Sequence, residues 1–88
     1  MSYHFDFTDL AKEDINSLKK SGNKALLKKI YILLTEIREH PFTGLGKPEA
    51  LKHHLTGLWS RRINKEHRLI YEISDDRILI LSAKGHYQ

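Results

Sequence analysis

Three residues in the second half of the chain have the chemistry needed to cleave RNA without a metal ion: Glu49, Arg68 and His86. Such a reaction needs a base that helps the 2′-hydroxyl attack phosphorus, an acid that protonates the departing 5′-oxygen, and a cation that stabilises the phosphorane. Histidine titrates near neutral pH and suits the acid, and a guanidinium binds two phosphate oxygens at once. Glu49 is the only carboxylate in the loop at 41–50, so it is the expected base.

Each of these residues also has a purely structural interpretation. His86 can be a solvated tail residue, Arg68 can pair with a surface acid, and Glu49 can balance neighbouring lysines; the partners concerned are Glu66, Glu72, Lys47 and Lys52. Metal binding is not expected, because His53 and His54 are adjacent and point in different directions, and no H-x-H or H-x3-H spacing occurs. We therefore expect neither a metal ion nor another cofactor.

The charge of the chain favours a polyanionic partner. Fifteen Lys and Arg stand against eleven Asp and Glu, which gives a formal charge of +4 over 88 residues. The excess gathers in residues 47–68, which hold Lys47, Lys52, Arg61, Arg62, Lys65 and Arg68 against Glu49 and Glu66. Basic clusters bind nucleic acid by releasing counterions from phosphates, although a solvated basic face would have the same composition.

Hydrophobic periodicity predicts one strand followed by two helices in the first half. Residues 2–7 alternate as a half-buried strand. Thr8 can cap a helix that ends at Gly22, and Asn23 can cap a second helix that extends to about His40. Pro41 stops that second helix.

The second half reads as a loop over 41–50 and then three strands, at Leu58–Ile63, Arg68–Ser74 and Arg77–Ala83. The expected fold class is α+β, in the order β-α-α-β-β-β, with two helices packed on one face of an antiparallel sheet. Residues 1–88 should form a single domain. The N-terminus has acids and no long apolar run, so neither a signal peptide nor a membrane span is predicted and a cytoplasmic location is expected.

This order of strands predicts that the polar residues converge. A two-residue turn at 75–76 would place Arg68 across from Ala83, with His86 just beyond it. Arg61 and Arg62 end the preceding strand beside them. We therefore expect both arginines, with Arg68 and His86, at one edge of the sheet.

The segment GKPEALKHHLTGLWSRRINKEHRLIYEI at 46–73, followed by a C-terminal HY, resembles the YoeB/Txe toxins of the RelE/ParE superfamily. The blocks G-K-P-E-x-L-K, W-S-R-R-I and E-H-R-L-[IV]-Y stand in the family's order and spacing. The resemblance implies a RelE-like, microbial-ribonuclease-like fold and ribosome-dependent cleavage of mRNA in the A site. It implies that Glu49 is the general base, Arg68 the transition-state arginine and His86 the general acid.

The same resemblance implies substrate-binding roles for Lys52, Arg62 and the C-terminal Tyr87. We expect Arg61 to bind substrate as well, because it is predicted to lie at the same sheet edge as Arg62. The implied partners are a cognate YefM/Phd-type antitoxin, the ribosome with its mRNA, and a second copy of the chain. Operator DNA would be bound only through the antitoxin. Gly85 stands where the family commonly has an aromatic residue, and Gln88 extends the usual terminus. A ParE-like gyrase poison and a non-catalytic RNA-binding protein of the same fold are the alternative functions.

Overall fold

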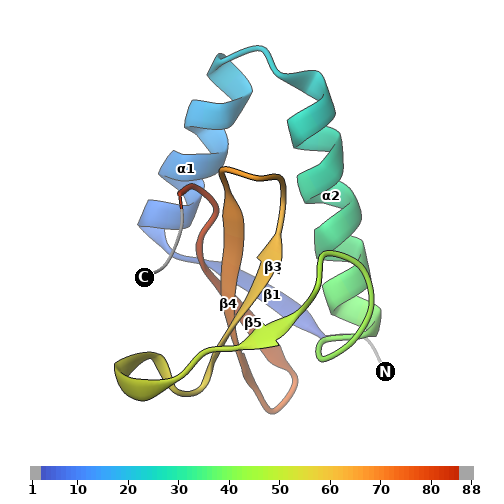
Figure 1. Cartoon of the computed structure of the whole chain (residues 1–88), viewed down its shortest axis with the longest axis vertical. Coiled ribbons are helices and arrows are strands. Elements are labelled where there is room, and N and C mark those ends of the chain that lie inside the picture. Colours follow the sequence, from blue (N-terminus) through green and yellow to red (C-terminus); the bar gives the residue numbers. More distant parts are fainter. Residues whose placement is uncertain (1–2, 86–88) are drawn as a thin grey trace.

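The computed structural model describes residues 3–85 and confirms the predicted order of elements. Before the strand predicted to begin at Leu58, the structure adds two short elements: a strand at the end of the segment 41–50, which was predicted to be a loop, and a 3₁₀ helix just after that segment (Figure 1). In chain order the elements are β1 (His4–Phe7), α1 (Asp9–Lys20), α2 (Lys24–Glu39), β2 (Glu49–Ala50), the 3₁₀ helix η1 (His53–Leu55), β3 (Leu58–Arg62), β4 (Arg68–Ser74) and β5 (Arg77–Ser82).

Both helices begin at the predicted capping residues. The Thr8 hydroxyl oxygen accepts a hydrogen bond from the Ala11 N–H at 3.0 Å, and Asn23 Oδ1 accepts one from the Leu26 N–H at 3.0 Å. These bonds satisfy backbone donors that the first helical turn leaves unpaired. The Thr8 hydroxyl also donates to the Leu81 carbonyl at 2.8 Å, which ties the start of α1 to β5.

The sheet has the strand order β1-β5-β4-β3-β2 and is mixed, where the sequence led us to expect an antiparallel sheet. The last three strands are antiparallel as predicted, but β1 lies parallel to β5, with His4 opposite Arg77. Asp6 and Arg77 form an ion pair at 2.9 Å across these strands. The direction of β1 was not predictable from hairpin geometry, because two helices rather than a tight turn follow it.

A β-bulge shifts the register of β4 and β5. Pairing runs from Ser74–Arg77 to Tyr71–Ile80 as a two-residue turn predicts, and then skips Leu81 so that Ile70 pairs with Ser82. The expectation that Arg68 lies across from Ala83 is therefore wrong by one position, and the Arg68 N–H donates to the Gly85 carbonyl at 3.0 Å. The extra residue in a bulge disrupts the ladder locally, and here the Leu81 carbonyl accepts the Thr8 hydroxyl instead.

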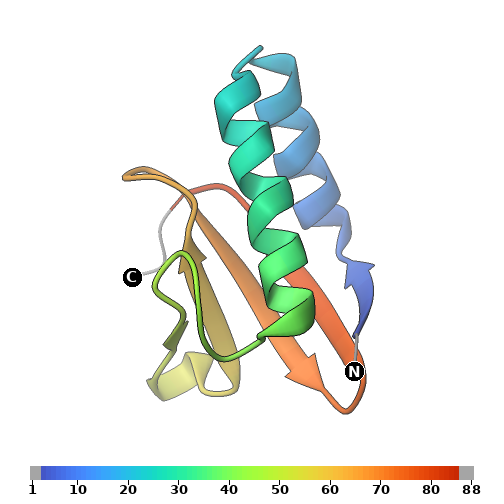
Figure 2. The same cartoon turned by 90° about the vertical axis from the view of Figure 1, so that its right-hand side faces the viewer.

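The two helices cover one face of the sheet, as predicted (Figure 2). Their buried positions pack against alternate residues of the strands, and the shared core comprises Ala11, Leu18, Leu26, Ile30, Leu33, Ile37, Ile63, Leu69, Tyr71, Ile78, Ile80 and Ala83. Because side chains alternate between the faces of a strand, the residues between these core positions point to the opposite face, which neither α1 nor α2 covers.

One charged residue lies inside this core. Arg61 has 0% of its surface exposed, and each nitrogen of its guanidinium donates a hydrogen bond to a protein oxygen. Its Nε donates to the Tyr71 hydroxyl at 3.0 Å, Nη1 donates to the Leu45 carbonyl at 2.9 Å, and Nη2 donates to the carbonyls of Thr43, at 2.8 Å, and His40. These bonds fasten the loop after α2 to the middle of the sheet.

The burial of Arg61 corrects its predicted role in substrate binding. Arg61 lies two residues from both Trp59 and Ile63, so the three side chains share the helix-covered face. Arg62 points to the open face and is exposed. Tyr71 completes the network, because its hydroxyl donates to the Pro41 carbonyl at 3.0 Å. Burial raises the pKa of the Tyr71 phenol, an effect that Arg61 partly opposes, so the hydroxyl keeps the proton that it donates.

Replacing this buried cation should destabilise the fold. We expect Arg61→Met to lower the free energy of unfolding by about 2–4 kcal/mol, because it leaves the loop carbonyls without their donor. Arg62→Met is the matched control and should change stability little, since its side chain is exposed. Urea denaturation of the two variants measures the difference, and equal effects would show that the Arg61 network does not stabilise the loop.

Candidate active site

The open face of the sheet brings together three of the residues predicted from the sequence. Glu49 pairs with Ser60, which pairs in turn with Ile70, so their side chains share one face. Arg62 pairs directly with Arg68 two residues farther along these strands, on the same face. Glu49, Arg62 and Arg68 therefore lie on the face opposite the helices.

Glu49 reaches this face because the segment before β2 lies close against β3. The Arg62 N–H donates to the Gly46 carbonyl at 2.7 Å, and the Leu51 N–H donates to the Leu58 carbonyl at 2.9 Å. Gly46 has φ +86°, and a Cβ there would approach Leu33 Cδ2 to 2.9 Å, so the backbone fits only as glycine. The short strand β2 then presents the exposed carboxylate of Glu49 at the sheet edge.

The carboxylate and the arginines lie on different strands of this face. Two strand spacings, about 10 Å, separate β2 from β4, and Arg68 lies two residues farther along β4 than Ile70, which is in register with Glu49. Within residues 3–85 no ion pair joins Glu49 to either arginine, and neither Glu66 nor Glu72 pairs with Arg68. The interpretation of Arg68 as a partner of a surface acid is thus not supported.

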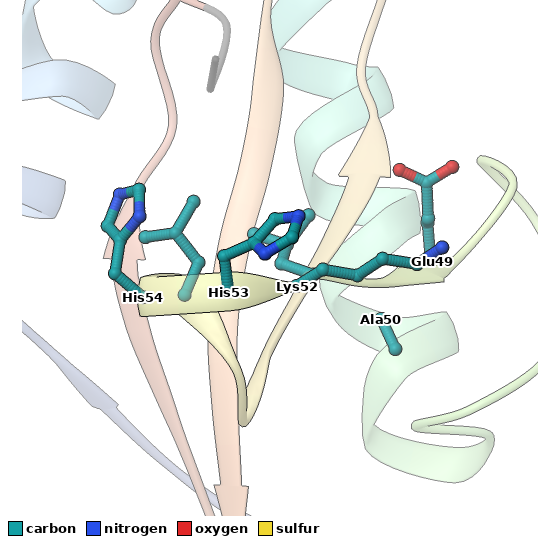
Figure 3. Close-up of a pocket in the computed structure, with 7 residues that line it drawn as sticks. Glu49, Ala50, Lys52, His53 and His54 are labelled. Atoms are coloured by element: carbon teal, nitrogen blue, oxygen red, sulfur yellow. The ribbon is translucent and has the colours of Figure 1, made fainter.

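A pocket beside Glu49 is lined by residues 49–55, which include Lys52 (Figure 3). The side chains of Glu49, His53 and His54 rise on the same side of this segment, and Ala50 points to the other side. His53 has φ +59°, a conformation that costs free energy in a residue with a side chain. The sequence suggested these histidines only as metal ligands, whereas their place in the G-K-P-E-x-L-K-H-H segment puts them next to the expected base.

Positive charge continues on the other side of Arg62. A second depression is lined by Lys29, Gly46, Lys47, Arg62, Ile63, Asn64 and Lys65. Four of these seven residues are cations, and they come from α2, the loop before β2, the end of β3 and the turn between β3 and β4. A nucleic-acid backbone that ran from Arg62 toward α2 over this end of the sheet would meet positive charge over several phosphates.

The remaining predicted site residues lie at or beyond the last described position. His86 and Tyr87 fall outside the described residues. Gly85, which precedes His86, is held beside Arg68 through its carbonyl. Residues 3–85 contain no group of three or more His, Cys, Asp or Glu placed to hold a metal ion. No helix in this part of the chain is long and apolar enough to cross a membrane.

Comparison of the sequence with known proteins identifies a family of bacterial toxins. Residues 7–87 match the family described as YoeB-like toxin of bacterial type II toxin–antitoxin system. The toxin YoeB of Synechocystis is 50% identical over 82 residues, which cover 93% of this chain and 94% of that protein.

Two solved structures extend the comparison to the fold. A YoeB dimer from Staphylococcus aureus has 43% identity and a TM-score of 0.88, covering 99% of this chain and all of the other. A heterotetrameric YoeB–YefM toxin–antitoxin complex from the same organism has 43% identity and a TM-score of 0.85, with the same coverage. These likenesses confirm the expected fold class and the resemblance noted in the sequence. The chain belongs to the YoeB-like toxins of bacterial type II toxin–antitoxin systems.

Proposed function

We propose that this toxin is an endoribonuclease that cleaves messenger RNA in the A site of the ribosome and thereby inhibits translation. The observation that carries the proposal is the placement of Glu49, Arg62 and Arg68 on one open face of the sheet, beside the backbone that leads to His86. An activity on translating ribosomes requires the cytoplasm.

The reaction proceeds by attack of the substrate's own 2′-hydroxyl. Glu49 accepts the proton of this hydroxyl while the 2′-oxygen forms a bond to phosphorus. Arg68 stabilises the negative charge of the phosphorane. His86 donates a proton to the 5′-oxygen as the P–O5′ bond breaks. The products are a 2′,3′-cyclic phosphate upstream and a free 5′-hydroxyl downstream.

The other cations bind rather than react. Arg62 lies next to Arg68 and can hold the scissile phosphate or its neighbour, and Lys52 lines the same pocket as Glu49. Tyr87 completes the proposed substrate contacts from the segment after Gly85. Glu49 and Arg68 come from separate strands, so an RNA that is already oriented by the ribosome gains most from them.

The proposed partners follow from the relatives and from the charge of the site. The Staphylococcus aureus relative has been seen as a dimer and in complex with YefM. We propose that this chain forms a homodimer and is silenced by a YefM/Phd-type antitoxin. Operator DNA would be contacted through that antitoxin only.

Cleavage should depend on the ribosome and on the 2′-hydroxyl. Purified protein with programmed ribosomes should produce new mRNA ends that carry a cyclic or 3′-phosphate and a 5′-hydroxyl, and naked RNA should be cut far more slowly. EDTA should not stop the reaction while the ribosomes remain intact, because base, acid and cation are all side chains. Primer extension and end-group analysis measure these outcomes. Cleavage of a message with a 2′-deoxy nucleotide at the cut site would contradict the mechanism.

The two proposed roles opposite Glu49 can be tested by substitution. His86→Gln should slow cleavage by roughly 10²–10⁴-fold, the usual contribution of a positioned acid. Arg68→Ala should cause a comparable loss by removing the charge that stabilises the phosphorane. Arg77→Ala is the control, because Arg77 is exposed at the opposite end of the sheet and paired with Asp6. Single-turnover rates on programmed ribosomes measure the effects, and an undiminished rate for either site variant rules out its assigned role.

A basic open face should be neutralised by an acidic segment that folds over it. Expression of the chain alone should arrest growth, and co-expression of a neighbouring small acidic reading frame should relieve the arrest. Colony counts with separately inducible promoters measure both effects. Harmless accumulation of folded protein would count against the toxin activity.

A further inference from the structure

The backbone of Gly85 is held from both sides by two consecutive residues. Its N–H donates to Nδ1 of His67 at 2.9 Å, and its carbonyl accepts the N–H of Arg68 at 3.0 Å. Gly85 has φ +82° and no atom within 4 Å of the position that a Cβ would occupy. With no side chain of its own to pack, this residue depends on these hydrogen bonds for its position.

His67 is itself fixed by the turn between β3 and β4. Asn64 Oδ1 accepts the His67 N–H at 2.7 Å, and the His67 carbonyl accepts the Ile63 N–H at 3.0 Å. The imidazole is largely enclosed, with 12% of the side chain exposed. The acceptor that holds Gly85 therefore sits on a rigid support at the same end of the sheet as Arg68.

The hydrogen bond to Gly85 also determines the tautomer of His67. An imidazole nitrogen accepts a hydrogen bond only when it carries no proton, so the proton of the neutral ring must be on Nε2. Nε2 lies 3.6 Å from Glu66 Oε2, and the carboxylate favours a proton on that side of the ring. Protonation of Nδ1 would place two donors against each other and release Gly85.

We propose that His67 is a positioning residue for the reaction: by accepting the Gly85 N–H it fixes, beside Arg68, the residue that directly precedes the proposed general acid His86. This inference rests on the proposed ribonuclease function. Consecutive Cα atoms are about 3.8 Å apart, so anchoring Gly85 restricts the region that the His86 ring can reach. In this proposal the Arg68 side chain binds the phosphate, and the Arg68 N–H helps to hold Gly85 by donating to its carbonyl.

The hydrogen bond can be tested without any activity measurement. Long-range ¹H–¹⁵N spectra of the labelled wild-type protein should show neutral His67 as the Nε2–H tautomer, and the Gly85 amide should exchange slowly with solvent. A neutral His67 with its proton on Nδ1, or a freely exchanging Gly85 amide, would overturn the anchor.

The positioning role needs a pair of variants that differ in one acceptor. Asn places its Oδ1 where histidine has Nδ1, so His67→Asn should retain the anchor, whereas His67→Leu keeps bulk and removes the acceptor. We expect His67→Leu to lower the single-turnover rate by about 10- to 100-fold, the scale of a small misplacement. KM for programmed ribosomes should stay within about twofold, and His67→Asn should recover most of the rate. His4→Leu, at an exposed position of the distal strand β1, is the control for loss of a histidine.

The outcomes separate this inference from the proposed function. If the wild type does not cleave ribosome-bound message, the ribonuclease proposal and the positioning role both fail, and the spectra still decide whether the anchor exists. If the wild type cleaves and folded His67→Leu cleaves equally fast, only the positioning role fails. A loss in His67→Leu that His67→Asn does not repair would assign the effect to packing and overturn the role as well.

Discussion

The buried guanidinium of Arg61 is the constraint on which the geometry of the sheet edge depends. A charge without water must find its partners inside the protein, and Arg61 finds them in three loop carbonyls and the Tyr71 hydroxyl. These bonds hold the loop that runs from α2 to Gly46, and the chain continues directly into β2. Glu49 therefore reaches the open face because a cation on the opposite face fixes the segment before it.

The two adjacent arginines of β3 have different roles: Arg61 stabilises the fold, and Arg62 is available to bind substrate. The strand turns each successive side chain to the other face, so Arg61 enters the core and Arg62 meets the open surface beside Arg68. Replacing Arg61 by lysine would break this network, because only a planar guanidinium can donate to several carbonyls and a ring hydroxyl at once. Replacing the exposed Arg62 by lysine would leave the network intact.

Much of the fold was predictable because local signals determined it. Thr8 and Asn23 cap the helices as expected, and alternation located the three long strands. The β-bulge and the direction of β1 were not predictable, since both depend on contacts between distant segments, such as Thr8 with Leu81. For the site, residue chemistry and family resemblance together selected Glu49, Arg62 and Arg68. Nothing in the sequence indicated that loop carbonyls would accept hydrogen bonds from Arg61, although the spacing by two residues that places it on the same face as Trp59 and Ile63 was visible.

The parallel pairing of β1 with β5 has a consequence for how the molecule is made. His4 lies opposite Arg77, so the first strand finds its partner only after more than seventy further residues have been synthesised. Contacts this distant in sequence form slowly, because the loop between them must lose its conformational freedom first. Until β5 has emerged from the ribosome that translates it, the sheet lacks both β5 and its neighbour β1, and the bulge that shifts the register of β4 and β5 does not exist. The nascent chain therefore cannot complete the sheet that carries Arg62 and Arg68 until its last strand has been synthesised.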